Sequence, residues 1–201
     1  MDVKRRLLLH CCCAPCATYV IDSLHSEYDI DVLFYNPNIE PVEEYEKRKN
    51  ELKKLINIYS LQSGSDDSKS LSDKDKKKIL IQMLPCEYNN DIFADRVNLL
   101  RNEPESGERC RICFDIRLAE TARRAKNSGY DIFATTLSAS PHKNAVVLND
   151  IGIKQSVDHN ILYLEADFKK NNGYIRSVEL SKKYGLYRQG YCGCIVSTAC
   201  T

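Results

Sequence analysis

No apolar run in this sequence approaches the length of a membrane span. The basic start of the chain is followed by only three consecutive leucines, Leu7 to Leu9, too few for the apolar core of a secretory signal. We therefore expect a cytoplasmic protein without a membrane partner.

The sequence also has neither a G-x-x-x-x-G-K-[ST] phosphate loop nor a G-x-G-x-x-G dinucleotide motif. Its net charge is only +1, from 29 basic and 28 acidic side chains, which neither demands nor excludes a nucleic-acid partner. A charge-balanced chain can still present a local basic face. The residues that would form a phosphate-binding surface are Lys4, Arg5, Arg6, Arg123, Arg124, Lys126, Lys169, Lys170, Arg176, Lys182, Lys183 and Arg188.

What the sequence does contain is an alternation of short apolar runs and longer helical patterns. Strands separated by helices imply crossover connections, so the pattern predicts a single α/β domain over 1–201 with a mostly parallel sheet flanked by helices, in a Rossmann-like layout. A polar, serine-rich insertion interrupts it near 60–78. The expected strands are 6–10, 30–35, 79–84, 131–137 and 161–164, and the expected helices 18–26, 42–59, 92–101, 110–127, 144–158 and 174–184.

The ten cysteines are the most informative feature. In a cytosolic protein, closely spaced cysteines indicate metal ligands or catalytic thiols rather than structural disulfides. Cys11, Cys12, Cys13 and Cys16 directly follow the first expected strand, and substrates of open parallel sheets bind beyond the carboxyl ends of strands. The alternative is that these residues are small buried hydrophobes.

A second group, Cys110 and Cys113, has C-x-x-C spacing at the start of the clearest expected helix. That spacing lets both sulfurs face one metal, and a helix start favours thiolate over thiol. A thioredoxin-like redox pair is the alternative, although the pair lacks the usual position of that motif after a strand. Together with two cysteines of the first loop, these residues suit a structural zinc or a 4Fe-4S cluster, between which spacing does not decide.

The third group is Cys192-Gly193-Cys194. A single intervening glycine suits a labile disulfide or two ligands on one ion, which predicts a redox pair or an additional metal site. Cys86 is expected in the core and Cys200 in the tail, and His10 is expected to be a satisfied core histidine.

Five further patterns follow one another along nearly the whole chain, namely LLLHCCCAPC (7–16), FYNPNIEPVEEYEKR (34–48), GERCRICFDIRLAETA (107–122), FATTLSASPHKN (133–144) and GLYRQGYCGCIVS (185–197). Together these segments resemble the cobalamin-independent epoxyqueuosine reductases of the QueH type. The family usually has a small hydroxyl residue where Cys11 stands, so the sequence leaves open which two cysteines of the first loop are the ligands.

This resemblance implies an iron–sulfur oxidoreductase that reduces epoxyqueuosine to queuosine at the tRNA wobble position. It implies a 4Fe-4S cluster held by Cys12, Cys13, Cys110 and Cys113, with Cys192 and Cys194 as catalytic residues. It also implies an additional mononuclear iron, for which the candidate ligands are Cys16, Cys192 and Cys194. The partners would be tRNA carrying epoxyqueuosine and an electron donor.

A modified base in an anticodon loop can turn out of the base stack and be recognised in a pocket of the protein. Tyr35, Asn36 and Asn38, at the end of the second expected strand, are candidates for that pocket. Two other functions remain open from the residues alone. One is a zinc-stabilised module that binds tRNA or a nucleotide, and the other is a thiol–disulfide oxidoreductase that uses Cys192 and Cys194.

Overall fold

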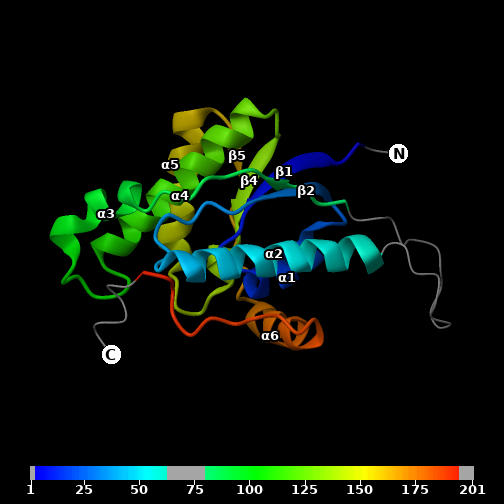
Figure 1. Cartoon of the computed structure of the whole chain (residues 1–201). Coiled ribbons are helices and arrows are strands. Elements are labelled where there is room, and N and C mark those ends of the chain that lie inside the picture. Colours follow the sequence, from blue (N-terminus) through cyan, green and yellow to red (C-terminus); the bar gives the residue numbers. More distant parts are fainter. Residues whose placement is uncertain (1–2, 63–79, 195–201) are drawn as a thin grey trace.

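The computed structural model describes residues 3–62 and 80–194 (Figure 1). The strands are β1 (Arg5–His10), β2 (Tyr28–Leu33), β3 (Met83–Leu84), β4 (Ile132–Thr135) and β5 (Leu162–Tyr163). The helices are α1 (Ala14–Leu24), α2 (Val42–Gln62), α3 (Asp91–Val97), α4 (Glu108–Asn127), α5 (Ala145–His159) and α6 (Gly173–Lys183), with 3-10 turns η1 (Asn98–Leu100) and η2 (Thr136–Ala139).

The five strands form one sheet in the order β3-β2-β1-β4-β5, and every neighbouring pair is parallel. The central strand is β1, in which Leu7 lies opposite Ile30 of β2 on one side and Ile132 of β4 on the other. The predicted α/β class with a parallel sheet is therefore confirmed, because each parallel neighbour is reached through a crossover connection.

Helices cover both faces of this sheet, so β4 and the last four residues of β1 are buried on both sides. Leu7 and Leu9 belong to the core that α1 and α2 share, whereas Leu8, which points the opposite way, belongs to the core of α4 and α5. Figure 1 shows α1, α2 and α6 on one side of the sheet and α4 and α5 on the other. The continuous apolar run in β1 follows from this double coverage.

The direction of the strand order reverses beside β1. The chain moves from β1 outward through β2 to β3, then crosses to the other side of β1 to form β4 and β5. In open parallel sheets this reversal leaves a crevice beyond the carboxyl ends of the two strands that flank it. Here those ends lead into the cysteine loop after β1 and into η2 after β4.

Several expected boundaries were wrong. Helix α1 begins at Ala14, four residues before the expected start, because Pro15 occupies the first turn, where proline is tolerated. Helix α2 continues to Gln62, three residues into the predicted insertion, and the rest of that insertion lies outside the described residues, as does Cys200. The third expected strand is reduced to Met83–Leu84 at the sheet edge, next to Pro85.

Within residues 3–62 and 80–194, no helix combines the length and the apolar character that crossing a bilayer requires.

Candidate active site

The loop after β1 brings three thiols together. Cys13 is the N-cap of α1 and Cys16 lies in its first turn, so both face Cys12. The sulfurs of Cys12, Cys13 and Cys16 all lie within 4.8 Å of one another, and the Cys12 and Cys13 sulfurs are 3.7 Å apart. Soft sulfur donors at this spacing form a group that can hold a metal ion.

Cys11 does not join this group. Its side chain is fully buried in the core of α1 and α2, where its thiol donates to the carbonyl oxygen of Leu9 at 3.6 Å. Burial raises the pKa of the Cys11 thiol well above its usual value. Of the three consecutive cysteines, Cys12 and Cys13 therefore belong to the thiol group, whereas Cys11 packs in the hydrophobic core.

The three clustered thiols change one another's pKa values. Contacts with the Cys13 and Cys16 thiols hold the pKa of Cys12 well below its usual value, whereas contacts with Cys12 and Cys13 raise the pKa of Cys16. The N-terminus of α1 adds partial positive charge beside them. The thiol group therefore favours a thiolate at Cys12.

The C-x-x-C pair lies at the start of α4, as expected. Cys110 and Cys113 lie in its first two turns, after the N-cap residue Gly107. The backbone N–H of Ser106 donates to the Cys110 sulfur at 3.3 Å. Burial raises the pKa of the Cys113 thiol, and the positive charge of Arg117 opposes that shift. The charged form of Cys113 therefore depends on Arg117.

Arg117 is a buried guanidinium, 3% exposed, that contacts three different segments. Its Nη1 donates to the Cys113 sulfur at 3.7 Å, its Nη2 to Asn36 Oδ1 at 2.5 Å, and its Nε to His10 Nε2 at 3.3 Å. Burial and the Arg117 charge lower the pKa of His10 to about 3, so this ring is neutral. In the described part of the chain no carboxylate lies within 4.0 Å of Arg117, and its positive charge lies beside the Cys113 sulfur and near Cys12.

Arg48 of α2 holds the C-x-C segment in place. This buried side chain pairs with Glu44 at 2.7 Å and donates to the carbonyl oxygens of Tyr191 and Cys192 at 3.2 and 3.1 Å. The backbone N–H of Glu40 donates to the carbonyl oxygen of Gly193 at 2.8 Å. These contacts attach the end of the described chain to the start of α2.

Gly193 has a backbone conformation that only glycine adopts readily, with φ of +108°. A Cβ atom there would lie 2.8 Å from Ile39 Cγ1 and 3.2 Å from Arg48 Nη1. We expect Gly193→Ala to lower the free energy of unfolding by about 1–3 kcal/mol through this strain. Urea unfolding measures the loss. Gly190→Ala is the matched control, because a Cβ at Gly190 meets no atom within 4 Å, and an equal loss in both variants would contradict the explanation.

Two adjoining cavities bring the three cysteine groups to one place. A cavity of about 250 Å³ is lined by Cys12 and Cys16, and a smaller one of about 20 Å³ by Cys110 and Cys113. Cys192 lines both cavities, and so do Glu105, Arg117 and Lys143. The larger cavity lies at the carboxyl ends of β1 and β4, because Ser140, His142 and Lys143, which follow β4, also line it. This is the position that the sheet reversal predicts.

The three residues predicted to contact a substrate are mostly internal. Tyr35 and Asn36 are buried and line neither cavity. The Asn36 amide donates to the carbonyl oxygen of Cys11 at 2.9 Å and accepts from Arg117, so it supports the cysteine loop. Asn38 lines the smaller cavity, and its buried Oδ1 has no hydrogen-bond partner among the described residues.

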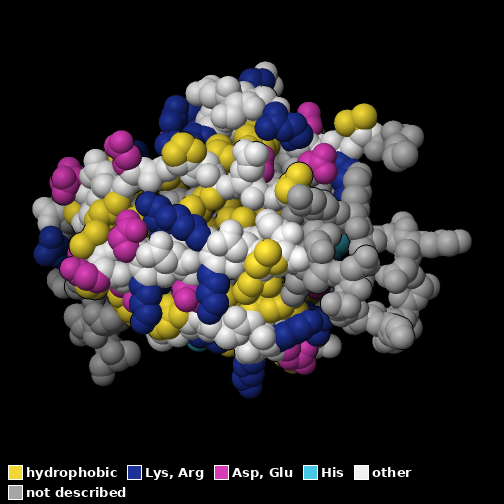
Figure 2. All heavy atoms as spheres, turned by 45° about the vertical axis from the view of Figure 1, so that its right-hand side comes forward, with side chains coloured by type: hydrophobic (Ala, Val, Ile, Leu, Met, Phe, Trp, Pro, Cys, Tyr) yellow, Lys and Arg dark blue, Asp and Glu magenta, His cyan; other side chains and the backbone are white. Residues whose placement is uncertain are grey.

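Of the basic residues proposed from the sequence, Arg188 is the one that lines the larger cavity in the described part of the chain. The face in Figure 2 shows Lys and Arg side chains interspersed with Asp and Glu. Several of the predicted residues form ion pairs instead, namely Arg123 and Arg124 with Glu120, Lys169 with Asp167, and Arg176 with Glu179.

Sequence patterns missed Glu105, Arg117, Tyr174 and Gln189, all of which line the larger cavity. Each is a single polar residue in a helix or a loop. No second residue of matching chemistry lies at a sequence spacing that would mark it as part of a site. The only available signal was for Arg117, which lies one helical turn after Cys113 and therefore on the same face.

The family described as "Epoxyqueuosine reductase QueH" matches this chain over residues 7–199. A protein of that name from Streptococcus pyogenes serotype M1 is 41% identical over 194 residues, which cover 96% of this chain and 71% of that protein. One from Acinetobacter baylyi is 38% identical, with 98% of this chain and 82% of the relative covered. One from Thermotoga maritima is 32% identical, with 95% and 89% covered.

Proposed function

Since the chain belongs to the QueH family of epoxyqueuosine reductases, we propose that the junction of its two cavities is where it reduces epoxyqueuosine in tRNA to queuosine, the last step of queuosine biosynthesis. One observation carries this proposal. Three cysteine groups that are far apart in the sequence line adjoining cavities at the reversal of a parallel sheet, where substrates of such folds bind.

The reaction removes the epoxide oxygen. Two C–O bonds break, a C=C bond forms, and the oxygen leaves as water, which consumes two electrons and two protons. Glu105, His142 and Lys143 line the larger cavity and are able to hold and transfer protons there. The electrons must come from a donor through a redox group that the thiols hold or form.

We assign a 4Fe-4S cluster to Cys12, Cys13, Cys110 and Cys113. The donor set fits in kind, because it consists of four cysteine thiols around two helix starts, with the positive charge of Arg117 beside Cys113 and near Cys12. When bound, such a cluster supplies electrons one at a time. The roles of Arg117, Asn36 and His10 are to fix the position of this thiol group and balance its charge.

Because the reaction needs two electrons and the cluster passes one at a time, a second redox group has to contribute. Cys192 and Cys194 are suited to this, either as a dithiol, whose oxidation to a disulfide releases two electrons and two protons, or as ligands, with Cys16, of an additional mononuclear iron that exchanges one electron. Cys192 lines both cavities and Cys16 lines the larger one, which supports either arrangement.

The test is anaerobic incubation of the reconstituted protein with a chemical reductant and tRNA that carries epoxyqueuosine, followed by mass analysis of the nucleosides. We expect brown protein that contains about four iron and four sulfide per cluster and converts epoxyqueuosine to queuosine. Colourless protein that contains zinc, or unconverted epoxyqueuosine despite a full cluster and bound tRNA, would contradict the proposal.

A further inference from the structure

The rim of the larger cavity carries an aromatic ring and a cation that the reduction chemistry does not use. Tyr174, in the first turn of α6, is 37% exposed, and the Arg188 guanidinium lies 5.9 Å from the centre of its ring. Nη1 of Arg188 donates to Ser181 Oγ at 3.3 Å. Within the described ranges Arg188 has no carboxylate within 4.0 Å, so its charge is available to a ligand.

Next to Arg188, the side chain of Gln189 contributes an acceptor to the same cavity. Its amide lies within hydrogen-bonding reach of the Cys13 thiol. Its Oε1 is buried and has no hydrogen-bond partner among the residues that the structure describes. A buried acceptor without a donor is unfavourable, and an N–H or O–H group of a ligand would satisfy it.

The charges around the cavity indicate the class of ligand. Lys143, Arg188 and the internal Arg117 contribute positive charge, whereas Glu105 is the only carboxylate among the lining residues. This balance favours an anionic ligand such as a phosphate. An exposed aromatic ring beside an arginine is also a typical arrangement for stacking an unpaired base and binding the adjacent phosphate.

We propose that Tyr174, Arg188 and Gln189 form the nucleotide-recognition site of this enzyme. A nucleoside splayed out of the tRNA loop enters the cavity, where Tyr174 stacks on a base and Arg188 binds a neighbouring phosphate. Gln189 Oε1 accepts a hydrogen bond from an N–H or O–H group of the nucleoside. This assignment rests on the proposed function, because it takes tRNA as the ligand. It adds the residues that recognise the tRNA.

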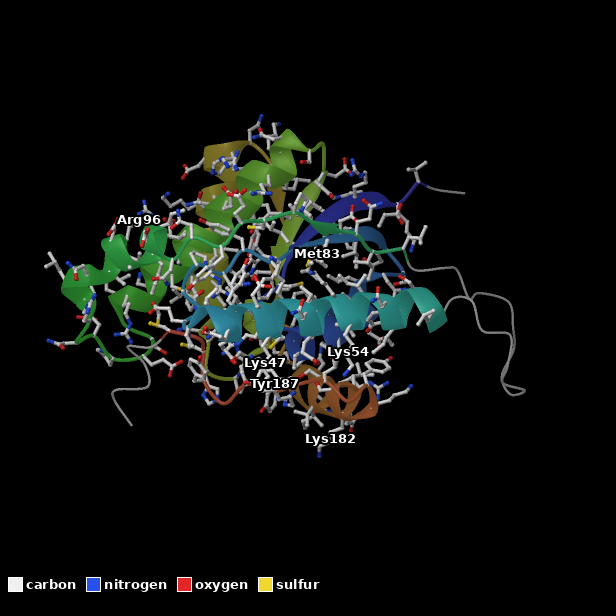
Figure 3. All side chains as sticks on the ribbon, viewed as in Figure 1. Lys47, Lys54, Met83, Arg96, Lys182 and Tyr187 are labelled. Atoms are coloured by element: carbon white, nitrogen blue, oxygen red, sulfur yellow. The ribbon has the colours of Figure 1, made fainter. Side chains whose placement is uncertain are left out.

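The first experiment measures binding of a fluorescently labelled anticodon stem-loop RNA as a function of salt. We expect Arg188→Gln to weaken binding and to reduce the slope of log K against log salt by about 1, because one phosphate contact is lost. The control is Lys182→Gln, which makes the same change of charge at a side chain that projects from α6 away from the sheet (Figure 3). Equal slopes in Arg188→Gln and the wild type, or equal reductions in both variants, would overturn the role of Arg188.

A second set of variants tests the stacking and the acceptor. Tyr174→Leu should weaken RNA binding by about 5- to 150-fold, which is the range for loss of one stacked base, whereas Tyr174→Phe should restore it. Gln189→Leu should weaken binding without changing the salt slope, because no charge is removed. Wild-type affinity in Tyr174→Leu and Gln189→Leu would overturn the assignment.

Turnover is measured separately on the same proteins. A wild type that converts epoxyqueuosine, together with variants that bind and turn over normally, would overturn the recognition site and leave the proposed function intact. A wild type that binds the RNA but does not convert epoxyqueuosine would overturn the function, while the binding data would still decide the recognition site.

Discussion

Replacing Cys12 with alanine is expected to remove most of the iron and sulfide and to lower turnover by more than about a hundredfold. Loss of a residue that only supports a metal ligand typically costs about 10- to 100-fold, so loss of a ligand should cost more. Cys12 is also the member of the three-thiol group whose pKa is lowered, which makes it the thiolate most available to iron. Iron and sulfide assays on anaerobically reconstituted protein measure the first effect, and nucleoside analysis the second.

Cys11→Ala is the matched control, since it makes the same chemical change at the adjacent residue. The Cys11 side chain is fully buried and its thiol donates to the Leu9 carbonyl oxygen instead of facing Cys13 and Cys16. We expect this variant to keep its iron and to lose only about 1 kcal/mol of stability, as is usual for a small core deletion. If Cys11→Ala lost the cluster while Cys12→Ala kept it, the ligand assignment in this loop would be wrong by one position.

Arg117→Met is expected to lower the free energy of unfolding by about 1–3 kcal/mol, even though methionine is apolar and fills part of the same space. The buried acceptor Asn36 Oδ1 loses its donor, and an unsatisfied buried group costs about that much, whereas His10 Nε2 keeps the Tyr35 carbonyl oxygen, 3.1 Å away, as a partner. Urea unfolding of the iron-free protein under reducing conditions measures this cost without a contribution from the cluster. Iron uptake should also fall, because Cys113 loses the positive charge that favours its thiolate.

Two further variants separate the possible causes. Arg117→Lys keeps the charge but cannot reach three partners at once, so we expect an intermediate loss. Arg123→Gln, on the same helix, removes an exposed arginine that pairs with Glu120, and such pairs contribute only about 0–1 kcal/mol. Wild-type stability in Arg117→Met would show that the buried network does not support the cysteine loop.

The contacts of Tyr187 illustrate why the end of the described chain could not be placed from the sequence. Its hydroxyl donates to Glu44 of α2, and its ring lies 3.5 Å from the Lys47 ammonium group (Figure 3). Together with the bonds from Arg48, these contacts bring Cys192 next to α2 and into both cavities. No local pattern in the segment after α6 encodes them, because the partners lie far away in the chain.

The sequence by itself determined the parallel α/β sheet, the position of two cysteine groups at a strand end and a helix start, and the resemblance to a reductase family. These features depend on local periodicity, spacing and turn residues, which act between near neighbours. Only the tertiary structure decided that Cys11 turns into the core while Cys12, Cys13 and Cys16 share a centre. It also decided that a lone arginine, Arg117, joins the end of β1, the loop after β2 and α4 at the site. Such arrangements arise where strands and helices from distant parts of the chain meet, and burial there determines which polar groups must find one another.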